Sequence, residues 1–215
     1  MEIRPVGASA LLVDLGENVD GSGDAVDPAL VEAWRVTLWR RRAAGDFDAV
    51  DVVPGARTVL LDGLDDPVGL AARLPGWAPS VGEASAPGPV IEIPTWYDGP
   101  DVPAVARHWG VSEESVVARH RATEFRVAFG GFAPGFAYLT GLPPALAVPR
   151  LDTPRTRVPA GSVGLADIYC GIYPTASPGG WLLIGRTDAV LFDPERDPPA
   201  LLAPGARVRF VPAVT

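Results

Sequence analysis

The sequence predicts two structural units, an α+β unit over residues 1–84 and a mostly β unit over residues 85–215. Three observations lead to this prediction. The chain of 215 residues contains 24 glycines and 24 prolines, which indicates many short elements joined by tight turns. Residues 75–89 are rich in Pro, Gly, Ala and Ser, as linkers are. The helical pattern stops after Thr123, and sequence typical of strands follows.

The first unit is expected to contain three strands and two helices. Residues 10–15 (ALLVDL) form a buried strand, and residues 49–61 form two strands around a Pro-Gly turn. Asp27 is expected to cap a helix that begins at Pro28 and carries apolar side chains at helical spacing. A shorter helix covers residues 65–74. The order β-α-β-β-α is the beginning of a ferredoxin-like split βαβ unit.

The second unit is expected to begin with a strand and a pair of helices. Residues 90–97 alternate like a strand, and residues 101–121 form two helices. Asp101 is expected to cap the first helix, Gly110 to end it and Ser112 to start the second. Further strands are predicted at residues 125–129, 181–185, 189–193 and 207–211.

The composition excludes several kinds of function. The formal net charge of −8 and the pI near 4.7 argue against nonspecific binding to nucleic acid or to an anionic membrane. All 18 basic residues are arginines, so the chain has no Schiff-base lysine and no lysine of a Walker A or kinase ATP site. If ATP is used, we expect another chain to handle it.

Cysteine usage and hydropathy predict a cytoplasmic protein, and the placing of the histidines predicts no metal site. Cys170 is the only cysteine and can form no intrachain disulfide. We find no signal-peptide pattern, and no run approaches the length of about 18 apolar residues that a membrane span needs. His108 and His120 lie on different predicted helices, and no CxxC or HExxH motif occurs.

Two segments approach known functional motifs without satisfying them. Residues 101–121 have the outline of a DNA-binding helix-turn-helix, but Glu113 and Glu114 lie on the second helix of an acidic protein. We therefore expect a structural helical hairpin. Residues 160–164 (AGSVG) resemble a nucleophile elbow around Ser162, yet both histidines lie upstream and strand-like sequence follows. A turn that offers backbone N–H groups and a hydroxyl to a ligand or partner is the preferred interpretation.

Three blocks of spaced glycine, proline, tryptophan and arginine carry a resemblance to a known family. They are GFAPGFAYL at 131–139, TPRTRVPAGSVGLA at 153–166 and GIYPTASPGGWLLIGRT at 171–187. In these blocks the chain closely resembles the family of KipI, allophanate hydrolase subunit 1 and the B subunit of 5-oxoprolinase (PxpB). The flanking sequence extends the resemblance over nearly the whole chain. One departure is Tyr169-Cys170, where the family often has Gln-Thr.

The resemblance implies a ferredoxin-like N-terminal part and a cyclophilin-like β-barrel C-terminal part. It implies a larger partner subunit, called PxpC, KipA or allophanate hydrolase subunit 2, and a third subunit, PxpA. Together they would convert 5-oxoproline to glutamate, with ATP used by the complex and not bound by this chain alone, and with no metal or prosthetic group. A KipI-like inhibitor of a histidine kinase is the non-enzymatic alternative. We expect the chain alone to be catalytically silent.

The apolar stretch GGFAPGFAYLTGL, residues 130–142, is too rich in glycine and proline for a helix or a central strand. Its glycines allow close approach by another chain, and Pro134 stiffens the turn. Phe132, Phe136 and Tyr138 are then large surfaces on a pre-ordered loop, suited to a subunit interface or a pocket wall. Alternatively these rings fill the core, and we expect one or two of the three to be buried.

The matched blocks also supply the candidate site residues. Arg155 and Arg186 are candidates for catalysis, with Ser162, because a guanidinium fork fits a substrate carboxylate or phosphoryl group. Arg157 is a further binding candidate, and pairing of an arginine with Asp167 or Asp188 is the structural alternative. Residues 131–139 and 171–187 are expected to share one face and to contact the larger partner. The other residues expected to bind substrate or partner are Phe132, Pro134, Gly135, Phe136, Tyr138, Gly161, Tyr173, Pro178, Gly179, Gly180 and Trp181.

Overall fold

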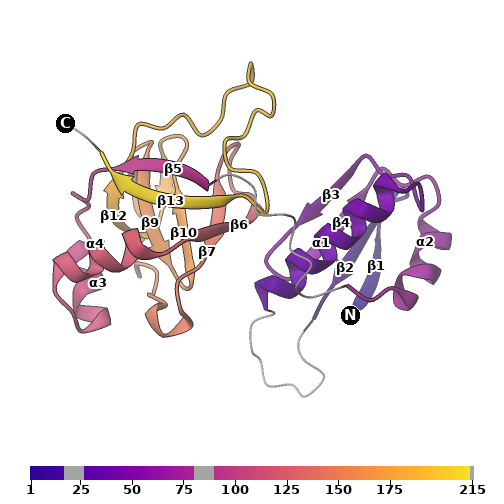
Figure 1. The fold of residues 1–215 in the computed structure, drawn as a ribbon, viewed down its shortest axis with the longest axis horizontal. Helices are drawn as coiled ribbons and strands as arrows, with labels where there is room; N and C mark the ends of the chain where they lie inside the picture. Colours follow the sequence, from indigo (N-terminus) through magenta and orange to yellow (C-terminus); the bar gives the residue numbers. More distant parts are fainter. Residues whose placement is uncertain (17–26, 80–89, 214–215) are drawn as a thin grey trace. The chain divides into compact units, whose positions relative to one another are not determined.

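The computed structural model describes residues 1–16, 27–79 and 90–213 (Figure 1). The chain divides into two compact units, Met1–Pro87 and Gly88–Thr215, each with its own apolar core. The predicted boundary near residue 85 and residues 80–89 of the predicted linker lie outside the described residues. The assignment of these units as separate domains therefore stays a prediction.

Within its described residues, the first unit combines a four-stranded antiparallel sheet with two α-helices. Its elements are β1 (Glu2–Val6), β2 (Ala10–Asp14), α1 (Pro28–Ala43), β3 (Asp51–Pro54), β4 (Thr58–Asp62), α2 (Pro67–Arg73) and the 3₁₀ turn η1 (Leu74–Gly76). The sheet order is β1-β2-β4-β3. The predicted order β-α-β-β-α runs from β2 to α2. The edge strand β1 was not predicted, because it is mostly exposed and its sequence has no alternating apolar face.

The start of α1 follows the predicted local signals. The Asp27 carboxylate accepts a hydrogen bond from the backbone N–H of Ala29 at 2.8 Å, and Pro28 occupies the first turn, where its missing N–H costs nothing. Trp34 and Leu38 are buried on the inner side of the helix. They pack in one core with strand residues that include Leu11, Val13, Val59 and Leu61.

The second unit is built on a seven-stranded sheet that is nearly closed into a barrel. Its elements are β5 (Val90–Thr95), α3 (Val102–Trp109), α4 (Glu113–Ala122), β6 (Phe125–Gly130), β7 (Ala137–Thr140), η2 (Pro144–Leu146), β8 (Arg155–Val158), β9 (Ser162–Ala166), β10 (Tyr169–Ile172), β11 (Ser177–Gly179), β12 (Leu182–Arg186) and β13 (Arg207–Pro212). The sheet order is β12-β9-β10-β7-β6-β13-β5, and β8 pairs with β11. The edge strands β5 and β12 meet where Trp96 and Arg186 exchange backbone hydrogen bonds of 2.9 and 2.8 Å.

The helices α3 and α4 pack onto the barrel sheet and contribute to its core (Figure 1). Gly110 ends α3 in the left-handed conformation, and Ser112 caps α4 by accepting a hydrogen bond from a backbone N–H, both as predicted. Val105 and Val116 are fully buried in the same cluster as the strand residues. The helix pair is thus a structural part of the barrel.

The predicted capping role of Asp101 is wrong. Asp101 stands at the N-cap position of α3, but its side chain makes no capping hydrogen bond. One carboxylate oxygen accepts from the backbone N–H of Leu183 at 2.6 Å, and the other accepts from Arg155 Nη2 at 2.8 Å. These partners lie 82 and 54 residues further along the chain. The start of α3 is therefore tied to β12 and β8.

Two predictions about strands were also wrong. Residues 137–140, inside GGFAPGFAYLTGL, form β7 between β10 and β6, because the breakers end at Gly135, before the strand starts. Residues 189–193 form no strand, and Phe192 makes only an isolated bridge with Ala200. Strands β8, β10 and β11 were missed, and β9 was expected only as strand-like sequence after Gly164. Strand β9 is buried at every position, and its sequence shows no alternation that would mark where it starts.

His120 is fully buried between α4 and the sheet. Its Nδ1 is hydrogen-bonded to the Tyr97 hydroxyl at 2.8 Å, its Nε2 lies 3.3 Å from Cys170 Sγ, and the rings of Phe125 and Phe210 pack against it. Burial lowers the pKa of His120 to about 3, so the imidazole is neutral in the folded protein. Burial also raises the pKa values of the Cys170 thiol and the Tyr97 phenol.

We expect the protein to lose stability as the pH falls from about 6.5, the pKa of an unfolded histidine, towards the pKa of about 3 of buried His120. The folded state binds the proton less readily than the unfolded state, so protonation favours unfolding. Between pH 6 and 5 the slope should approach about 1.4 kcal/mol per pH unit in urea unfolding experiments. His120→Phe should remove this slope, and His108→Gln, at an exposed histidine, should retain it. An equal slope in the His120 variant would contradict the assignment.

Candidate functional site

Strand β9 separates two apolar clusters on opposite faces of the barrel sheet. Successive side chains of a strand point to opposite faces. Val163 and Leu165 lie in the main barrel core, whereas Ala166 and the space beside Gly164 face a second cluster. This second cluster draws side chains from all three matched sequence blocks.

The second cluster is dominated by the aromatic rings of Phe136, Tyr138, Tyr173 and Trp181. The Phe136 ring centroid lies 5.1 Å from that of Tyr138 and 5.5 Å from those of Tyr173 and Trp181, in edge-to-face arrangements. Such a pair contributes about 0.5–1.5 kcal/mol beyond its area burial. Phe136 and Trp181 are each only 4% exposed, so the cluster is a rigid wall.

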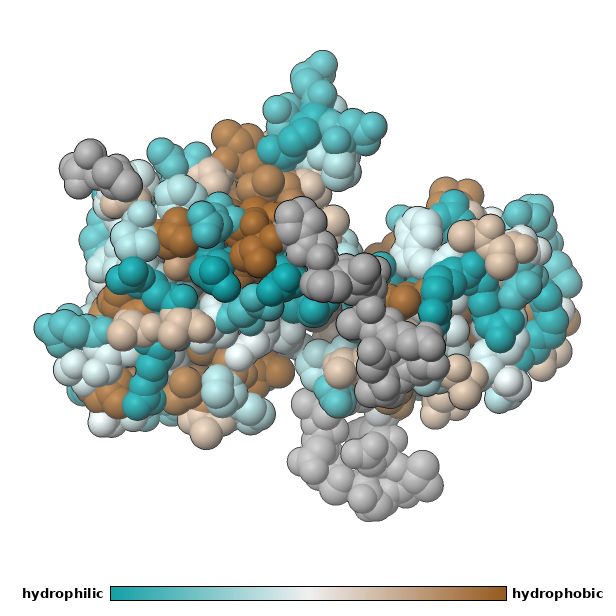
Figure 2. Space-filling model, in the orientation of Figure 1, coloured by the Kyte–Doolittle hydropathy of each residue, from teal (hydrophilic) through white to brown (hydrophobic). Residues whose placement is uncertain are grey.

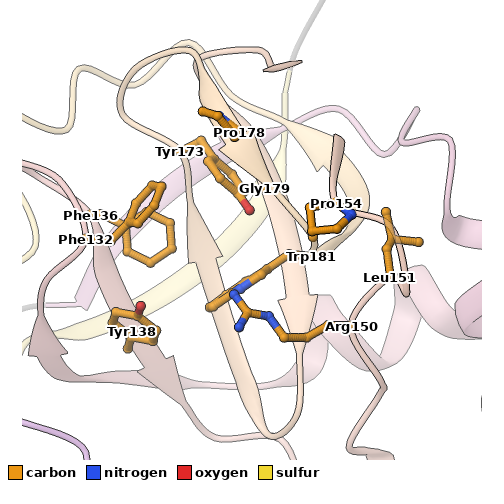
Figure 3. Close-up of a pocket in the computed structure, with 11 residues that line it drawn as sticks. Phe132, Phe136, Tyr138, Arg150, Leu151, Pro154, Tyr173, Pro178, Gly179 and Trp181 are labelled. Carbon is orange, nitrogen blue, oxygen red and sulfur yellow. The ribbon is translucent and has the colours of Figure 1, made fainter. Parts of the chain in front are cut away.

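The aromatic cluster borders a cavity of about 330 Å³, within the usual range for small-molecule sites (Figure 3). Figure 3 shows the side chain of Arg150 reaching toward Trp181, with the hydroxyl groups of Tyr138 and Tyr173 turned toward the same space. The residues expected from the sequence that line the cavity are Phe132, Phe136, Tyr138, Tyr173, Pro178, Gly179, Gly180 and Trp181. Arg150, Leu151 and Pro154 also line it and were not expected.

Arg150 is the only charged residue among the described residues that line this cavity. Its side chain is exposed and makes no hydrogen bond or ion pair with the part of the chain that the structure describes. Burial raises the pKa of the Tyr173 phenol, and the charges of Arg150 and Arg155 oppose this rise. The one sequence signal for Arg150 is its position just before the matched block 153–166.

Two adjacent glycines shape the cavity differently. A Cβ atom at Gly179 would overlap the phenol of Tyr173, whereas one at Gly180 would meet Pro154 at an ordinary 3.6 Å. Only Gly179 is therefore required for the position of the Tyr173 ring.

Gly179→Ala should destabilise the fold by about 1–3 kcal/mol, because the added methyl group displaces a packed ring. Gly180→Ala is the matched control and should stay within about 0.5 kcal/mol of the parent. Thermal unfolding measures the stability, and near-ultraviolet circular dichroism reports the packing of Tyr173 and Trp181. Equal stability of the two variants would show that Gly179 does not set the shape of the cavity.

Phe132 and Phe136 occupy opposite situations in one turn. Phe132 is 62% exposed and adopts a positive φ of 67°, a conformation that costs a non-glycine residue free energy. Phe136 is buried, and Tyr138 is partly exposed. One of the three rings, Phe136, is buried, but it lies in the aromatic cluster and not in the barrel core that was expected from the sequence. Phe132 is thus the aromatic side chain of this turn that another molecule can reach.

The candidate arginines Arg155, Arg157 and Arg186 are not gathered around the cavity. Arg155 pairs with Asp101 and Arg186 pairs with Asp98 at 2.9 Å, so their partners are not the expected Asp167 or Asp188. The Arg186 guanidinium also lies 4.7 Å over the Trp96 ring. Arg157 is exposed on β8 and does not line the cavity. Arg155 and Arg186 are therefore engaged in holding β8 and β12 to the segment before α3.

Ser162 is buried at the start of β9 and is followed by strand, without the helix of a nucleophile elbow. His120 is bonded as described above, and His108 Nε2 is hydrogen-bonded to the carbonyl of Ala147 at 2.8 Å. Neither histidine pairs with Ser162. Among the described residues, no group of three His, Cys, Asp or Glu side chains is placed to hold a metal ion. In the same residues no helix is both long and apolar enough to cross a membrane.

Pro134 and Gly161 line a second hollow of about 560 Å³, together with residues 187–192. Gly135 adopts a positive φ of 83°, and a Cβ atom there would press on Phe192. The turn at 131–136 therefore packs against residues 191–192. Figure 2 shows apolar surface on the second unit near the base of its projecting hydrophilic loop, in agreement with the exposed side chains of Val190 and Phe192.

The side chains of Tyr169 and Cys170, where the resemblance leads us to expect Gln-Thr, lie on opposite faces of β10. The Tyr169 ring lies 5.8 Å from Phe129 and 5.6 Å from Tyr138, so it extends the aromatic cluster. Cys170 faces the barrel core and contacts His120. At position 169 the chain thus has aromatic packing where the resemblance leads us to expect a polar amide.

Comparisons with known proteins agree on one family. Residues 1–202 match the family model described as carboxyltransferase domain, subdomain C and D. The chain is 43% identical over 196 residues to the B subunit of 5-oxoprolinase from Escherichia coli O157:H7, covering 87% of this chain and 89% of that protein. It is 38% identical over 218 residues to the B subunit of 5-oxoprolinase from Haemophilus influenzae, covering 98% and 97%. The crystal structure of TTHA0988 in space group P212121 superimposes with a TM-score of 0.75 at 37% identity. That match covers 100% of this chain but only 41% of TTHA0988.

Proposed function

The chain belongs to the carboxyltransferase domain family, subdomains C and D, and we propose that it is a subunit of an ATP-dependent 5-oxoprolinase. This enzyme would convert 5-oxoproline, ATP and water to glutamate, ADP and phosphate. The observation that carries the proposal is the 43% identity to a B subunit of 5-oxoprolinase over 89% of that protein. Both curated relatives described above bear this name, so inhibition of a histidine kinase is not favoured.

Partner subunits are part of this proposal. The relatives are named as one subunit of 5-oxoprolinase, which implies other subunits, and TTHA0988 is a longer chain of which this protein matches 41%. We assign the larger subunit and a third subunit, expected from the resemblance, as partners. Because the chain has no lysine, ATP would be bound mainly by a partner.

The structural features support, as a further part of the proposal, the two fold types that the resemblance implies. In the first unit, the order β2-β4-β3 with α1 between β2 and β3 supports a ferredoxin-like arrangement of residues 1–84. In the second, a nearly closed seven-stranded sheet with α3 and α4 packed against it supports a cyclophilin-like barrel over residues 85–215.

The test is co-expression of the chain with the subunits encoded beside it, followed by an assay of glutamate release from 5-oxoproline. Release should require ATP and all subunits, and the chain alone should be silent. Release of glutamate by the purified chain alone, or no release by any combination of subunits, would overturn the proposal.

We further propose that Phe132 contacts the larger subunit, because it is a large aromatic side chain held exposed at a strained position. Phe132→Ala should weaken the complex by about 2–4 kcal/mol, as expected for a hot-spot aromatic. Co-purification and a titration of the larger subunit measure the effect. The variant should stay folded, since Phe132 is 62% exposed and loses only its edge-to-face contacts with Phe136 and Tyr173. Val68→Ala, at an 80% exposed residue of the first unit, is the control. Undiminished binding by folded Phe132→Ala would remove this residue from the interface.

A further inference from the structure

We propose that the aromatic cavity binds the ring of 5-oxoproline and that Arg150 binds its carboxylate, an inference that rests on the proposed function. The cavity is the space bordered by Phe136, Tyr138, Tyr173 and Trp181, with Arg150 at its side (Figure 3). More generally, the site is suited to a small cyclic amide that carries a carboxylate.

The charges around the cavity favour an anion. No aspartate or glutamate of the described part of the chain lines it, although the whole chain has a net charge of −8. Arg150 has no partner within the described residues, whereas Arg155 is paired with Asp101 and Arg186 with Asp98. An unpaired guanidinium fork can accept a carboxylate without first breaking an ion pair. Arg150 therefore replaces the arginines expected from the sequence as the carboxylate-binding residue.

The walls of the cavity favour a small, flat ring. Five of the eleven lining residues are aromatic, and their packing is fixed by the edge-to-face contacts among Phe136, Tyr173 and Trp181. A rigid wall loses little conformational entropy when a ligand binds. A lactam also has one N–H donor and one carbonyl acceptor. The hydroxyl group of Tyr138, which is partly exposed and turned toward the cavity in Figure 3, is able to pair with one of these groups.

Direct binding to the full chain tests the proposal. Isothermal titration calorimetry would measure the affinity of the chain for three ligands. They are 5-oxoproline, 2-pyrrolidinone, which has the ring but no carboxylate, and inorganic phosphate, which is an anion without a ring. Arg150→Gln should weaken binding of 5-oxoproline by at least about tenfold, as expected for loss of a charge-assisted hydrogen bond, and leave 2-pyrrolidinone unaffected. Arg107→Gln, at another exposed arginine without a partner among the described residues, should leave the affinities for both ligands unchanged. Circular dichroism confirms the fold of each variant.

Three results would overturn the proposal. The first is that the wild-type chain does not bind 5-oxoproline. The second is that folded Arg150→Gln binds 5-oxoproline as tightly as the wild-type chain does. The third is that phosphate binds at the site as tightly as 5-oxoproline. Tyr138→Phe provides a second variant. This variant should bind both 5-oxoproline and 2-pyrrolidinone more weakly than the wild-type chain if the phenol pairs with the lactam. Affinities for both ligands equal to those of the wild-type chain would exclude that contact.

Kinetics of the co-expressed complex separate this inference from the proposed function. Arg150→Gln should raise the KM for 5-oxoproline by about tenfold and leave the KM for ATP unchanged. Turnover of 5-oxoproline with an unchanged KM would overturn the role of Arg150 while the proposed function stands. Binding of 5-oxoproline to the chain without turnover by the complex would overturn the proposed function and leave the binding site supported.

Discussion

Replacing Asp101 with alanine is expected to lower the free energy of unfolding by about 3 kcal/mol. The Asp101 carboxylate is mostly buried and accepts two hydrogen bonds, from Leu183 N–H and from the Arg155 guanidinium. Its loss leaves both donors without their acceptor in a partly desolvated place. It also loosens the attachment of α3 to β12, at the seam that nearly closes the barrel. Chemical unfolding measures the change.

Asp98→Ala is the matched control for this prediction. Asp98 also precedes α3 and pairs with an arginine from a matched block, Arg186, but both side chains are more than half exposed. Removing such a pair should cost at most about 1 kcal/mol. If the two variants were equally stable, burial of the Asp101 contacts would not be what stabilises this seam.

Gly161→Ala is expected to destabilise the second unit by about 3–5 kcal/mol or to prevent its folding. Gly161 has a positive φ of 78°, and a Cβ atom there would overlap the carbonyl oxygen of Thr187. The backbone cannot move away easily, because Gly161 N–H donates to Tyr173 O at 2.7 Å and Gly161 O accepts from Thr187 N–H at 2.9 Å. Expression of folded protein and its melting temperature measure the effect.

Gly110→Ala isolates backbone strain from steric overlap. Gly110 also has a positive φ, of 64°, but a Cβ atom there would meet no atom within 4 Å. The strain alone should cost about 1–2 kcal/mol. A Gly161 variant no less stable than the Gly110 variant would show that Thr187 moves aside, and the glycine of the AGSVG segment would then need another explanation.

Local signals placed the elements whose ends depend on neighbouring residues. The caps at Asp27 and Ser112 and the left-handed end at Gly110 each involve atoms within a few residues, so the sequence pattern contains the whole interaction. Strands β8, β10 and β11 were not predicted, and the start of β9 was not placed, because these strands are short, rich in glycine or buried on both faces. Their sequences carry no period that distinguishes them from loops.

By itself the sequence determined the family, through three blocks of glycine, proline, tryptophan and arginine, and most of the residues that line the aromatic cavity. Only the tertiary structure decided which arginine is available to a ligand. Arg155 and Arg186 are paired with aspartates 54 and 88 residues away, because near-closure of the barrel brings β8 and β12 against the segment before α3. Arg150, outside the blocks, lies at the cavity without a partner among the described residues. Contacts over such separations depend on how the sheet closes, which no local pattern of residues specifies.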